Sequence, residues 1–539
     1  MSGSITLENR FGVNQMELIS LKYAIFVIVL LVLYYCFPKK YRWYVLLAGS
    51  MAYYVIICKW YVLFIIFTIC TTYGSTIWID KLLKKQNAIV KSHKEDWDRQ
   101  TRKEYKEKGR KKRVAVMLFA LLCNFGILAF LKYIPYAGEL GLLLPLGISF
   151  YTFQSMGYVM DVYREIVEPE KNFLKVALFV SFFPQIIQGP IAIYDKLAGQ
   201  LYEGHSLRLE NLQKGALLVL WGVMKKLVIA DRAVNIINFV MDKPMDFSGT
   251  YVFFAAVVYA LQLYADFSGG IDIVRGIAEM FGITMSTNFN HPYFSRSLTE
   301  YWHRWHMTLG DWCRNYIFYP LSISKRFLNF GKWLKPRFGA HISKVLPGCI
   351  ASVITFIVIG VWHGANMKYL YFGLWNGIVI MLAELFAPVN KKVAGGFFKL
   401  TGLREKGIFA TIISVLWTFM LILVGYYFDI AANASTAFHM LFKSVMDFHI
   451  SELGINNIIL NLGACGLDEY DILLLIICTL LWFFISFVEE NKKLDMRDFI
   501  LSRKLPLRWA IIYLGIFIVI IFGYYGPGVN PADFVYMQF

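Results

Sequence analysis

Apolar residues along the chain fall into long runs that are separated by shorter polar segments. Thirteen of these runs are candidates for crossing a bilayer, which takes about 20 predominantly apolar residues. They lie near residues 18–37, 42–58, 60–78, 114–132, 140–161, 173–192, 212–230, 250–265, 345–363, 368–387, 408–428, 472–488 and 509–525. With re-entrant segments counted among them, we predict an all-α polytopic membrane protein of roughly 11–13 transmembrane or re-entrant helices. We expect a single integral membrane domain over residues 1–539.

The composition excludes the main alternatives to a membrane protein. Of the 539 residues, 58% are hydrophobic and 17% are charged, and the mean hydropathy is +0.52. Soluble domains carry about 25% charged residues, and so little polar surface cannot cover so much apolar chain in water. A soluble multidomain enzyme, a disordered chain and a disulfide-stapled secreted module are therefore excluded.

The net charge of +17 is concentrated in one segment and predicts the topology. Residues 80–113 hold 14 Lys or Arg against 6 Asp or Glu. Cytoplasmic loops of membrane proteins are rich in Lys and Arg, so we interpret 80–113 as a basic cytoplasmic loop facing anionic lipid. A nucleic-acid site is disfavoured because the loop has few aromatic residues and no matching motif. Lys39, Lys40 and Arg42 follow the first apolar run and place its end in the cytoplasm. If this run crosses the membrane, the N-terminus before it is extracellular, and that is our prediction.

The charge distribution in the C-terminal part of the chain predicts a topology that agrees with this orientation. Residues 430–470 hold one basic residue, Lys443, against four acidic ones, and are expected outside the cell. Residues 489–508 hold six Lys or Arg and are expected in the cytoplasm. The last run then places the tail 526–539, with the C-terminus, outside.

Familiar soluble-enzyme motifs are missing from the sequence. The eight cysteines are scattered without a C-x-x-C pair, so we predict neither a metal site nor a disulfide framework. No phosphate-binding loop, dinucleotide fingerprint, H-E-x-x-H or G-x-S-x-G motif occurs.

Residues 263–320 combine polar and aromatic side chains in a way that suits neither lipid nor bulk water. Ser297 and Glu300 form a capping box, which predicts a helix that begins near Leu298. His303 and His306 are three positions apart and would share a face of that helix. An interfacial amphipathic helix held by tryptophans explains the aromatic residues but not the histidines.

His306 and Asp311 also form an H-x4-D pattern. Residues five positions apart on a continuous helix point about 140° apart, so they would not form a catalytic dyad. We expect Asp311 to pair with Arg314 instead.

His363 is an ionisable residue inside an apolar run. Residues 345–367 lie between two lysines, and their only ionisable side chains are His363 and the thiol of Cys349. Such a group marks a functional site by default, and histidine is the natural base near neutral pH. Gly360 and Gly364 would let a substrate or another helix approach closely. A histidine satisfied by a neighbouring helix or placed at the interface remains the alternative.

Several motifs together resemble the membrane-bound O-acyltransferases, in particular the bacterial branch that includes alginate O-acetyltransferase subunits. The resemblance is carried by NFNHPYFSRSLTEYWHRWHMTLGDWCRNYIFYPL, IGVWHGA, LPLGISFYTFQSMGYVMDVYR, FFPQIIQGPI and YALQLYADFSGGIDIVRGIAEMFGI. It implies a multi-helix core around a central tunnel and an acyl-transfer activity. The family's near-invariant histidine corresponds to His363, and its second functional histidine corresponds to His306. His303 stands where relatives tend to have Arg and receives no catalytic role.

The resemblance implies a substrate and a mechanism. We expect acetyl-CoA, a cytoplasmic thioester, to donate an acetyl group for O-acetylation of an extracellular polysaccharide, with His363 as base and His306 orienting the acyl group or stabilising the oxyanion. Asn288 and Asp266 are weaker candidates for polar residues of the tunnel. D-alanyl transfer, lipid acylation and a non-catalytic transporter remain alternatives. The expected location is a bacterial plasma membrane, with lipid as the surrounding partner.

The C-terminal residues form an F-x-Y-x-x-F arrangement from Phe534 to Phe539. It resembles the terminal motif of this branch and the tail of a small partner peptide in teichoic-acid D-alanylation. The resemblance implies Tyr536 as an acyl carrier that passes the group to an extracellular SGNH-type partner protein. An aromatic anchor at the interface is the alternative.

Overall fold

The computed structural model describes residues 18–134, 138, 140, 142–401, 404, 407–454, 457, 463–526 and 534. All secondary structure within these ranges is helical, and each of the thirteen apolar runs overlaps a helix. The predicted all-α membrane fold is therefore confirmed.

Helix length separates the predicted runs into two groups. Within the described ranges, seven helical stretches are long and apolar enough to cross a membrane, or up to eight if the bent pair Met367–Leu385 and Ala387–Thr401 counts as one span. One of these stretches, Lys39–Ser92, contains two predicted runs. The runs near 18–37, 140–161 and 173–192 form α-helices of 16 residues or fewer. The run near 212–230 begins as a 16-residue α-helix and continues through a π-helical turn into the helix Asp231–Met241. A 16-residue helix rises about 24 Å, less than the roughly 30 Å hydrocarbon core.

The chain divides into two compact units. Unit 1 comprises Met1–Val219 and Ile271–Ser286, and unit 2 comprises Leu220–Gly270 and Thr287–Phe539. Two helices, α11 (Leu209–Met224) and α13 (Gly249–Met280), contribute residues to both. The other helices of unit 1 are α2 (Leu21–Cys36), η1 (Lys39–Tyr41), α3 (Arg42–Cys58), η2 (Lys59–Tyr61), α4 (Val62–Ser92), α5 (Arg99–Tyr133), α7 (Ile148–Tyr163), α8 (Phe173–Ser181), α9 (Phe183–Gln188) and α10 (Tyr194–Tyr202).

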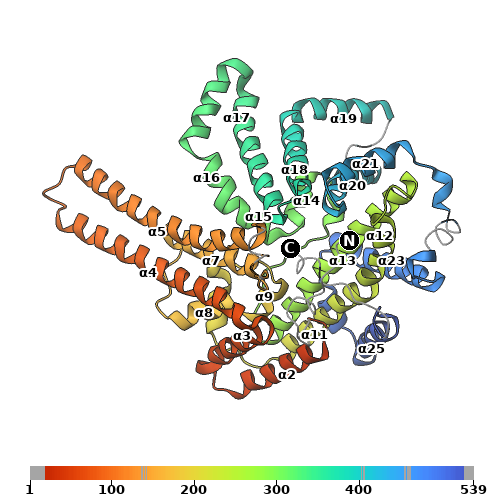
Figure 1. Cartoon of the computed structure of the whole chain (residues 1–539), viewed down its shortest axis with the longest axis horizontal. Coiled ribbons are helices and arrows are strands. Elements are labelled where there is room, and N and C mark those ends of the chain that lie inside the picture. Colours follow the sequence, from red (N-terminus) through yellow and green to blue (C-terminus); the bar gives the residue numbers. More distant parts are fainter. Residues whose placement is uncertain are drawn as a thin grey trace. The chain divides into compact units, whose positions relative to one another are not determined.

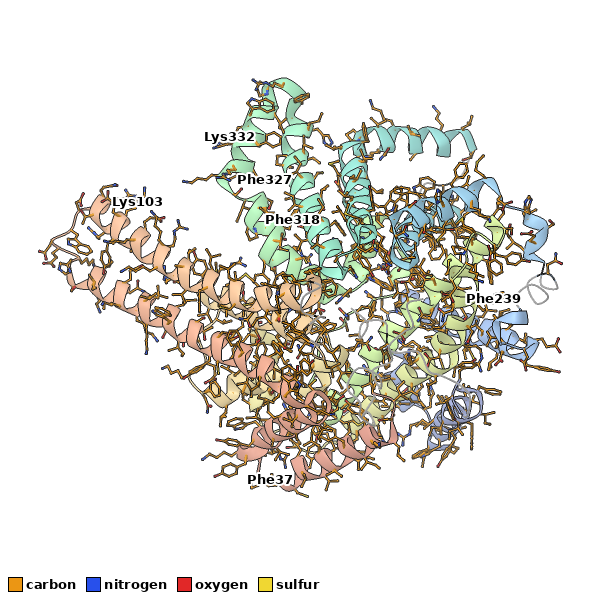
Figure 2. The ribbon with its side chains drawn as sticks, viewed as in Figure 1. Phe37, Lys103, Phe239, Phe318, Phe327 and Lys332 are labelled. Carbon is orange, nitrogen blue, oxygen red and sulfur yellow. The ribbon has the colours of Figure 1, made fainter. Side chains whose placement is uncertain are left out.

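The basic segment 80–113 forms most of a long helical hairpin. Helices α4 and α5 pack along each other, with Lys103 near the free end of the pair (Figures 1 and 2). Asp98 caps α5 by accepting a hydrogen bond from the Thr101 N–H at 2.9 Å. Charged pairs one turn apart, such as Lys84–Asp80 at 2.6 Å, support the polar part of the hairpin. The segment predicted as a loop is therefore largely helical, with a short connection at residues 93–98.

The short helices α7, α8 and α9 of unit 1 contribute buried aromatic side chains to its core. Tyr151, Phe179 and Phe183 are among its fully buried side chains. Gly147 precedes α7 with a positive φ of 69°, and a Cβ there would lie 2.2 Å from the Ile186 carbonyl oxygen. Only glycine fits this close approach between the start of α7 and α9.

Unit 2 contains the remaining helices. They are η3 (Lys225–Ala230), α12 (Asp231–Met241), η4 (Pro292–Phe294), α14 (Leu298–Arg304), α15 (Met307–Cys313), η5 (Arg314–Phe318), α16 (Tyr319–Ser322), α17 (Lys325–His363), α18 (Met367–Leu385), α19 (Ala387–Thr401), α20 (Ile408–Ile430), α21 (Ala434–Met446), η6 (Ile450–Leu453), η7 (Gly463–Cys465), α23 (Glu469–Lys492), α24 (Met496–Leu501) and α25 (Leu505–Phe522). Two of them, η3 and η5, are π-helical.

Helices α17 and α18 of unit 2 pack along each other. Helix α17 bends at Gly339, which separates a first limb, carrying Phe327 and Lys332, from the limb that ends at His363 (Figures 1 and 2). A Cβ on Gly360 would lie 2.3 Å from the Tyr369 carbonyl oxygen of α18, and a Cβ on Gly364 would lie 2.5 Å from the Tyr369 ring. The predicted close approach of another helix beside His363 is confirmed.

Candidate active site

His306 occupies a break between two helices rather than a helix face. Helix α14 begins at Leu298, as predicted, and the Ser297 hydroxyl caps it by accepting from the Glu300 N–H at 3.1 Å. The helix ends at Arg304, and His306 has left-handed backbone angles of φ 43° and ψ 52° before α15 begins. The prediction that His303 and His306 share one helix face is therefore wrong. Non-glycine residues in this conformation are uncommon and occur often at functional sites.

Asn288 imposes this break on the chain. Its backbone carbonyl accepts from the Met307 N–H at 2.9 Å. Its side-chain Oδ1 accepts from the Thr308 N–H at 3.1 Å and from the Thr308 hydroxyl at 2.8 Å. The same oxygen lies 3.2 Å from Nδ1 of His306. These long-range hydrogen bonds replace those that a continuous helix would make across the break.

The contacts of Asn288 also determine the tautomer of His306. A backbone N–H can only donate, so the atom facing Thr308 is the amide oxygen of Asn288. This oxygen accepts from His306, so Nδ1 carries the proton and Nε2 is the acceptor nitrogen. His306 is only 1% exposed, and burial lowers the pKa of its imidazole to about 3. The ring is therefore neutral at physiological pH.

His363 lies at the C-terminal end of α17 and is 8% exposed. Aromatic rings surround it: Tyr369 is nearly parallel at 5.9 Å, and Phe372 is edge-on at 5.5 Å. The carbonyl end of a helix carries partial negative charge, which favours a cation at this position. A positive charge that develops on His363 during proton transfer would therefore be stabilised.

Both histidines line the same cavity, which we call the histidine cavity. The Trp362 ring lies near both histidines: its centroid is 6.3 Å from that of the His306 ring and 4.9 Å from that of the His363 ring. The lining consists of Leu263, Tyr301, Trp302, Trp305, His306, Leu309, His363, Phe372, Asn376, Ile422, Tyr426 and Asp429. All of these residues belong to unit 2.

Neutral hydrogen bonds fix the aromatic wall of the histidine cavity. The Trp302 indole donates to Asn376 Oδ1 at 3.0 Å, and the Asn376 amide donates to the Phe372 carbonyl at 2.9 Å. The hydroxyls of Tyr301 and Tyr426 lie 2.7 Å apart. A wall whose polar atoms are hydrogen-bonded keeps its shape, so an acyl group and an acceptor would meet a preformed site.

Asp429 is a residue of the cavity that sequence reasoning missed. It lies near the end of α20, and its Oδ2 accepts from the Tyr259 hydroxyl at 2.8 Å. Its backbone carbonyl accepts from the Lys368 ammonium at 2.7 Å. An ionisable residue at the end of an apolar run was a visible signal, the same one that identified His363.

The other predicted site residues have different positions. Asn288 does not line the histidine cavity but holds His306 in place. Asp266 does not line it either, and it forms an ion pair with Lys226 at 2.7 Å. Tyr536 lies outside the described residues. Asp311 pairs with Arg314, as predicted.

The fold and the histidine cavity together define the class: an all-helical, multi-pass membrane protein with a preformed site that holds two histidines. Residues 169–335 match the family model described as MBOAT, membrane-bound O-acyltransferase family. This segment includes His306 and ends before His363. Over this segment the chain is similar to the family, and over a longer stretch it is similar to alginate O-acetylases.

Three relatives illustrate the range of proteins to which the chain is similar. A probable alginate O-acetylase of Pseudomonas syringae pv. tomato is 31% identical over 58% of this chain and 54% of the relative. A peptidoglycan O-acetyltransferase of Helicobacter pylori is 30% identical over 51% of this chain and 56% of the relative. A teichoic acid D-alanyltransferase of Bacillus subtilis is 26% identical over 52% and 67%. The chain thus spans little more than half the length of the first two relatives.

Proposed function

We propose that the protein is a membrane O-acyltransferase that moves an acetyl group from cytoplasmic acetyl-CoA across the membrane for O-acetylation of an extracellular polysaccharide. The observation that carries the proposal is that His306 and His363, which are distant in sequence, line one cavity. The names of the relatives support acetyl transfer to a polymer.

His363 acts as the general base in this proposal. Its imidazole takes the proton of an acceptor hydroxyl while the hydroxyl oxygen attacks the thioester carbonyl carbon. The new C–O bond forms, the C–S bond breaks, and the departing thiolate takes the proton back from the imidazolium. The position of His363 at the carbonyl end of α17 supports the cationic intermediate.

His306 orients the reactants through its acceptor nitrogen. Because Nδ1 donates to Asn288, Nε2 accepts a hydrogen bond from a donor group of the substrate. This tautomer favours the orienting role over the second predicted role, because an oxyanion needs a hydrogen-bond donor. Asn288 is then a positioning residue, since it holds the tautomer and the backbone of His306.

The distribution of charge supports a direction of transfer. The basic hairpin around residues 80–113 suits the cytoplasmic side, where acyl thioesters are found. In the proposed topology both termini lie outside a bacterial plasma membrane, on the side of the polysaccharide.

Tyr536 serves as the acyl carrier between the cavity and an extracellular SGNH-type partner. A phenol is an adequate nucleophile once a base removes its proton, and its ester remains reactive. Mass spectrometry of the chain after incubation with isotope-labelled acetyl-CoA should find the label on Tyr536, and Tyr536→Phe should lose turnover. If Tyr536 carries no adduct and Tyr536→Phe retains turnover, the tail is an interfacial anchor.

The central experiment compares two histidine variants. Cells that express the chain are assayed for ester-linked acetate on their secreted polysaccharide. His363→Ala should abolish the acetate, whereas His303→Ala should retain it, because His303 is exposed and does not line the cavity. Wild-type acetylation in His363→Ala would contradict the catalytic role and favour a transporter.

Asp429 favours D-alanyl transfer as a second candidate function. A carboxylate in an aromatic cavity is a suitable partner for the ammonium of an aminoacyl group. Thioesters of acetate and of D-alanine, supplied separately to the purified chain, distinguish the two. A chain that consumes only the D-alanyl thioester, and loses this activity in Asp429→Asn, would support the second candidate.

A further inference from the structure

A second buried polar centre of unit 2 surrounds Lys226. Its ammonium is 3% exposed and lies 2.7 Å from Asp266 and 2.8 Å from Asp231. We call these three residues the Lys226 cluster. The π-helical turn η3 builds it, since the Asp231 N–H bonds to the Lys226 carbonyl five residues earlier. That spacing brings the two side chains to one face, where an α-helix would separate them by about 140°.

The aromatic ring of Phe534 covers the Lys226 cluster. The Lys226 ammonium lies 4.5 Å from the ring centroid, and Phe534 is 5% exposed. An ammonium over the face of an aromatic ring is attracted by the ring's negative face, and the attraction strengthens when water is excluded. Phe534 belongs to the C-terminal tail, so the tail reaches a charged centre of the protein interior.

The root of the tail is fastened beside the same cluster. After α25, the Tyr524 N–H donates to the Leu227 carbonyl at 2.8 Å. The Arg232 guanidinium donates to the Phe522 carbonyl at 3.1 Å and lies 5.6 Å from the Tyr524 ring centroid. Residues 226–232 therefore hold the chain just before the tail through Arg232 and Tyr524, and the tail itself through Lys226 and Phe534, each time with a cation against an aromatic ring.

The Lys226 cluster is connected to the candidate active site through α13. Asp266 is followed by Phe267, whose ring lies edge-on to the His306 imidazole at 4.9 Å. The ion pair that holds Lys226 and the ring that packs on His306 are thus neighbours on one rigid helix.

From these contacts we infer that the Lys226 cluster is a receptor for the C-terminal tail: Lys226 holds Phe534 and thereby positions the tail for acyl transfer. Lys226 is in this sense a positioning residue. The contribution to transfer rests on the proposed function, whereas the seating of the tail does not.

Thiol labelling measures the seating of the tail directly. A cysteine is introduced by Gln538→Cys in the full-length chain, and its reaction with a polyethylene glycol maleimide is followed in detergent. The chain without this substitution gives the background of the native cysteines. Phe534→Leu, which keeps an apolar side chain but removes the ring, should raise the labelling rate roughly 5- to 30-fold.

Two controls test whether the ring itself is responsible. Phe534→Trp keeps an aromatic face, so its labelling rate should stay close to that of the parent. Phe442→Leu, at an exposed phenylalanine of α21, should also leave the rate unchanged. Equal rates in Phe534→Leu and the parent would overturn the proposal, as would equal increases in the Leu and Trp variants.

A double-mutant cycle tests the pairing with Lys226. In a Lys226→Met background, Phe534→Leu should cause no further increase in labelling, because the cation is already gone. Additive effects would show that Phe534 is held by something else. If Lys226→Met does not fold, Lys226→Arg replaces it, and its rate should match that of the parent because guanidinium groups stack well on aromatic rings.

Acetyl transfer from labelled acetyl-CoA tests the second half of the inference. Phe534→Leu should lower turnover, and Phe534→Trp should restore it. Faster labelling with unchanged turnover would overturn the positioning role while leaving the proposed function intact. No transfer by the wild-type chain would overturn the proposed function, whereas the labelling result would still decide whether Lys226 seats the tail.

Discussion

Unit 2 contains two buried polar centres, and they differ in charge and in packing. The histidine cavity has an aromatic wall held by neutral hydrogen bonds, with one carboxylate, that of Asp429, in its lining. The Lys226 cluster has full charges, packed so that an ammonium meets two carboxylates at 2.7 and 2.8 Å. Space beside histidines allows a substrate to enter and react, whereas a close-packed charge cluster holds segments of the chain together. Variants in the first centre should therefore change activity with little effect on stability, whereas variants in the second should change stability and, through the seating of the tail, also activity.

The largest effect on activity should come from His363→Gln. Removing a general base typically costs about 10²- to 10⁴-fold in rate, and glutamine keeps polarity without basicity. Because His363 is at a helix end beside a cavity, the free energy of unfolding should change by less than about 1 kcal/mol. Turnover of labelled acetyl-CoA and thermal unfolding in detergent measure the two quantities. A variant that loses stability and activity together would remove the contrast between the two centres.

The largest effect on stability should come from Lys226→Met. It leaves Asp231 and Asp266 buried without their cation, which typically costs about 3–5 kcal/mol of unfolding free energy. Adding Asp231→Asn and Asp266→Asn to the same chain should recover most of the loss, since no unpaired charge then remains. Denaturant unfolding in detergent gives the three values. A stable single variant would mean that the carboxylates do not need Lys226.

Asn288→Ala should have an intermediate effect on activity, and it should also lower the free energy of unfolding, because it leaves buried donors of His306 and Thr308 without their acceptor. Without the amide oxygen, His306 can adopt the wrong tautomer, and we expect a loss of roughly 10- to 100-fold in turnover. Because burial lowers the pKa of His306 to about 3, the ring stays neutral, and the loss should be equal at pH 6 and pH 8. Asn288→Asp keeps an acceptor for Nδ1 and should retain more activity. Equal losses in both variants would contradict the tautomer argument.

The contrast between the two centres also shows how far the sequence could predict the site. Long apolar runs predict helices because apolar length is a local property, and each run overlaps a helix in the structure. The Ser297 cap is local too, and it was predicted correctly. His363 was identifiable because an ionisable side chain stands out in an apolar run. Lys226 and Asp429 carry the same signal, because each is an ionisable side chain at or near the end of an apolar run.

Features that depend on distant residues were not predictable. The break at His306 follows from hydrogen bonds to Asn288, 18 positions away. A local pattern that favours a helix therefore gave way to tertiary contacts. Asp266 had the residue type expected for a tunnel, but its ion pair with Lys226 spans 40 positions and cannot be derived from spacing.

Helix packing beside the cavity allows a smaller test. Gly373→Ala would place a Cβ 2.3 Å from the Phe356 carbonyl oxygen of α17, and such overpacking costs about 1–3 kcal/mol. Gly348→Ala is the matched control, because nothing lies within 4 Å of its Cβ and alanine favours a helix by up to about 1 kcal/mol. Thermal unfolding should move in opposite directions in the two variants. If both shift alike, the spacing of α17 and α18 is set elsewhere.

The smallest effect should come from Asp311→Asn, and its size decides the role of the H-x4-D pattern. Asp311 pairs with Arg314, and both side chains are more than a third exposed, so solvent screens the pair. Exposed pairs contribute about 0–1 kcal/mol, and we expect turnover to stay within about twofold of wild type. Asp311 does not line the histidine cavity, unlike His306. A loss of turnover as large as that of His363→Gln would instead make His306 and Asp311 a working dyad.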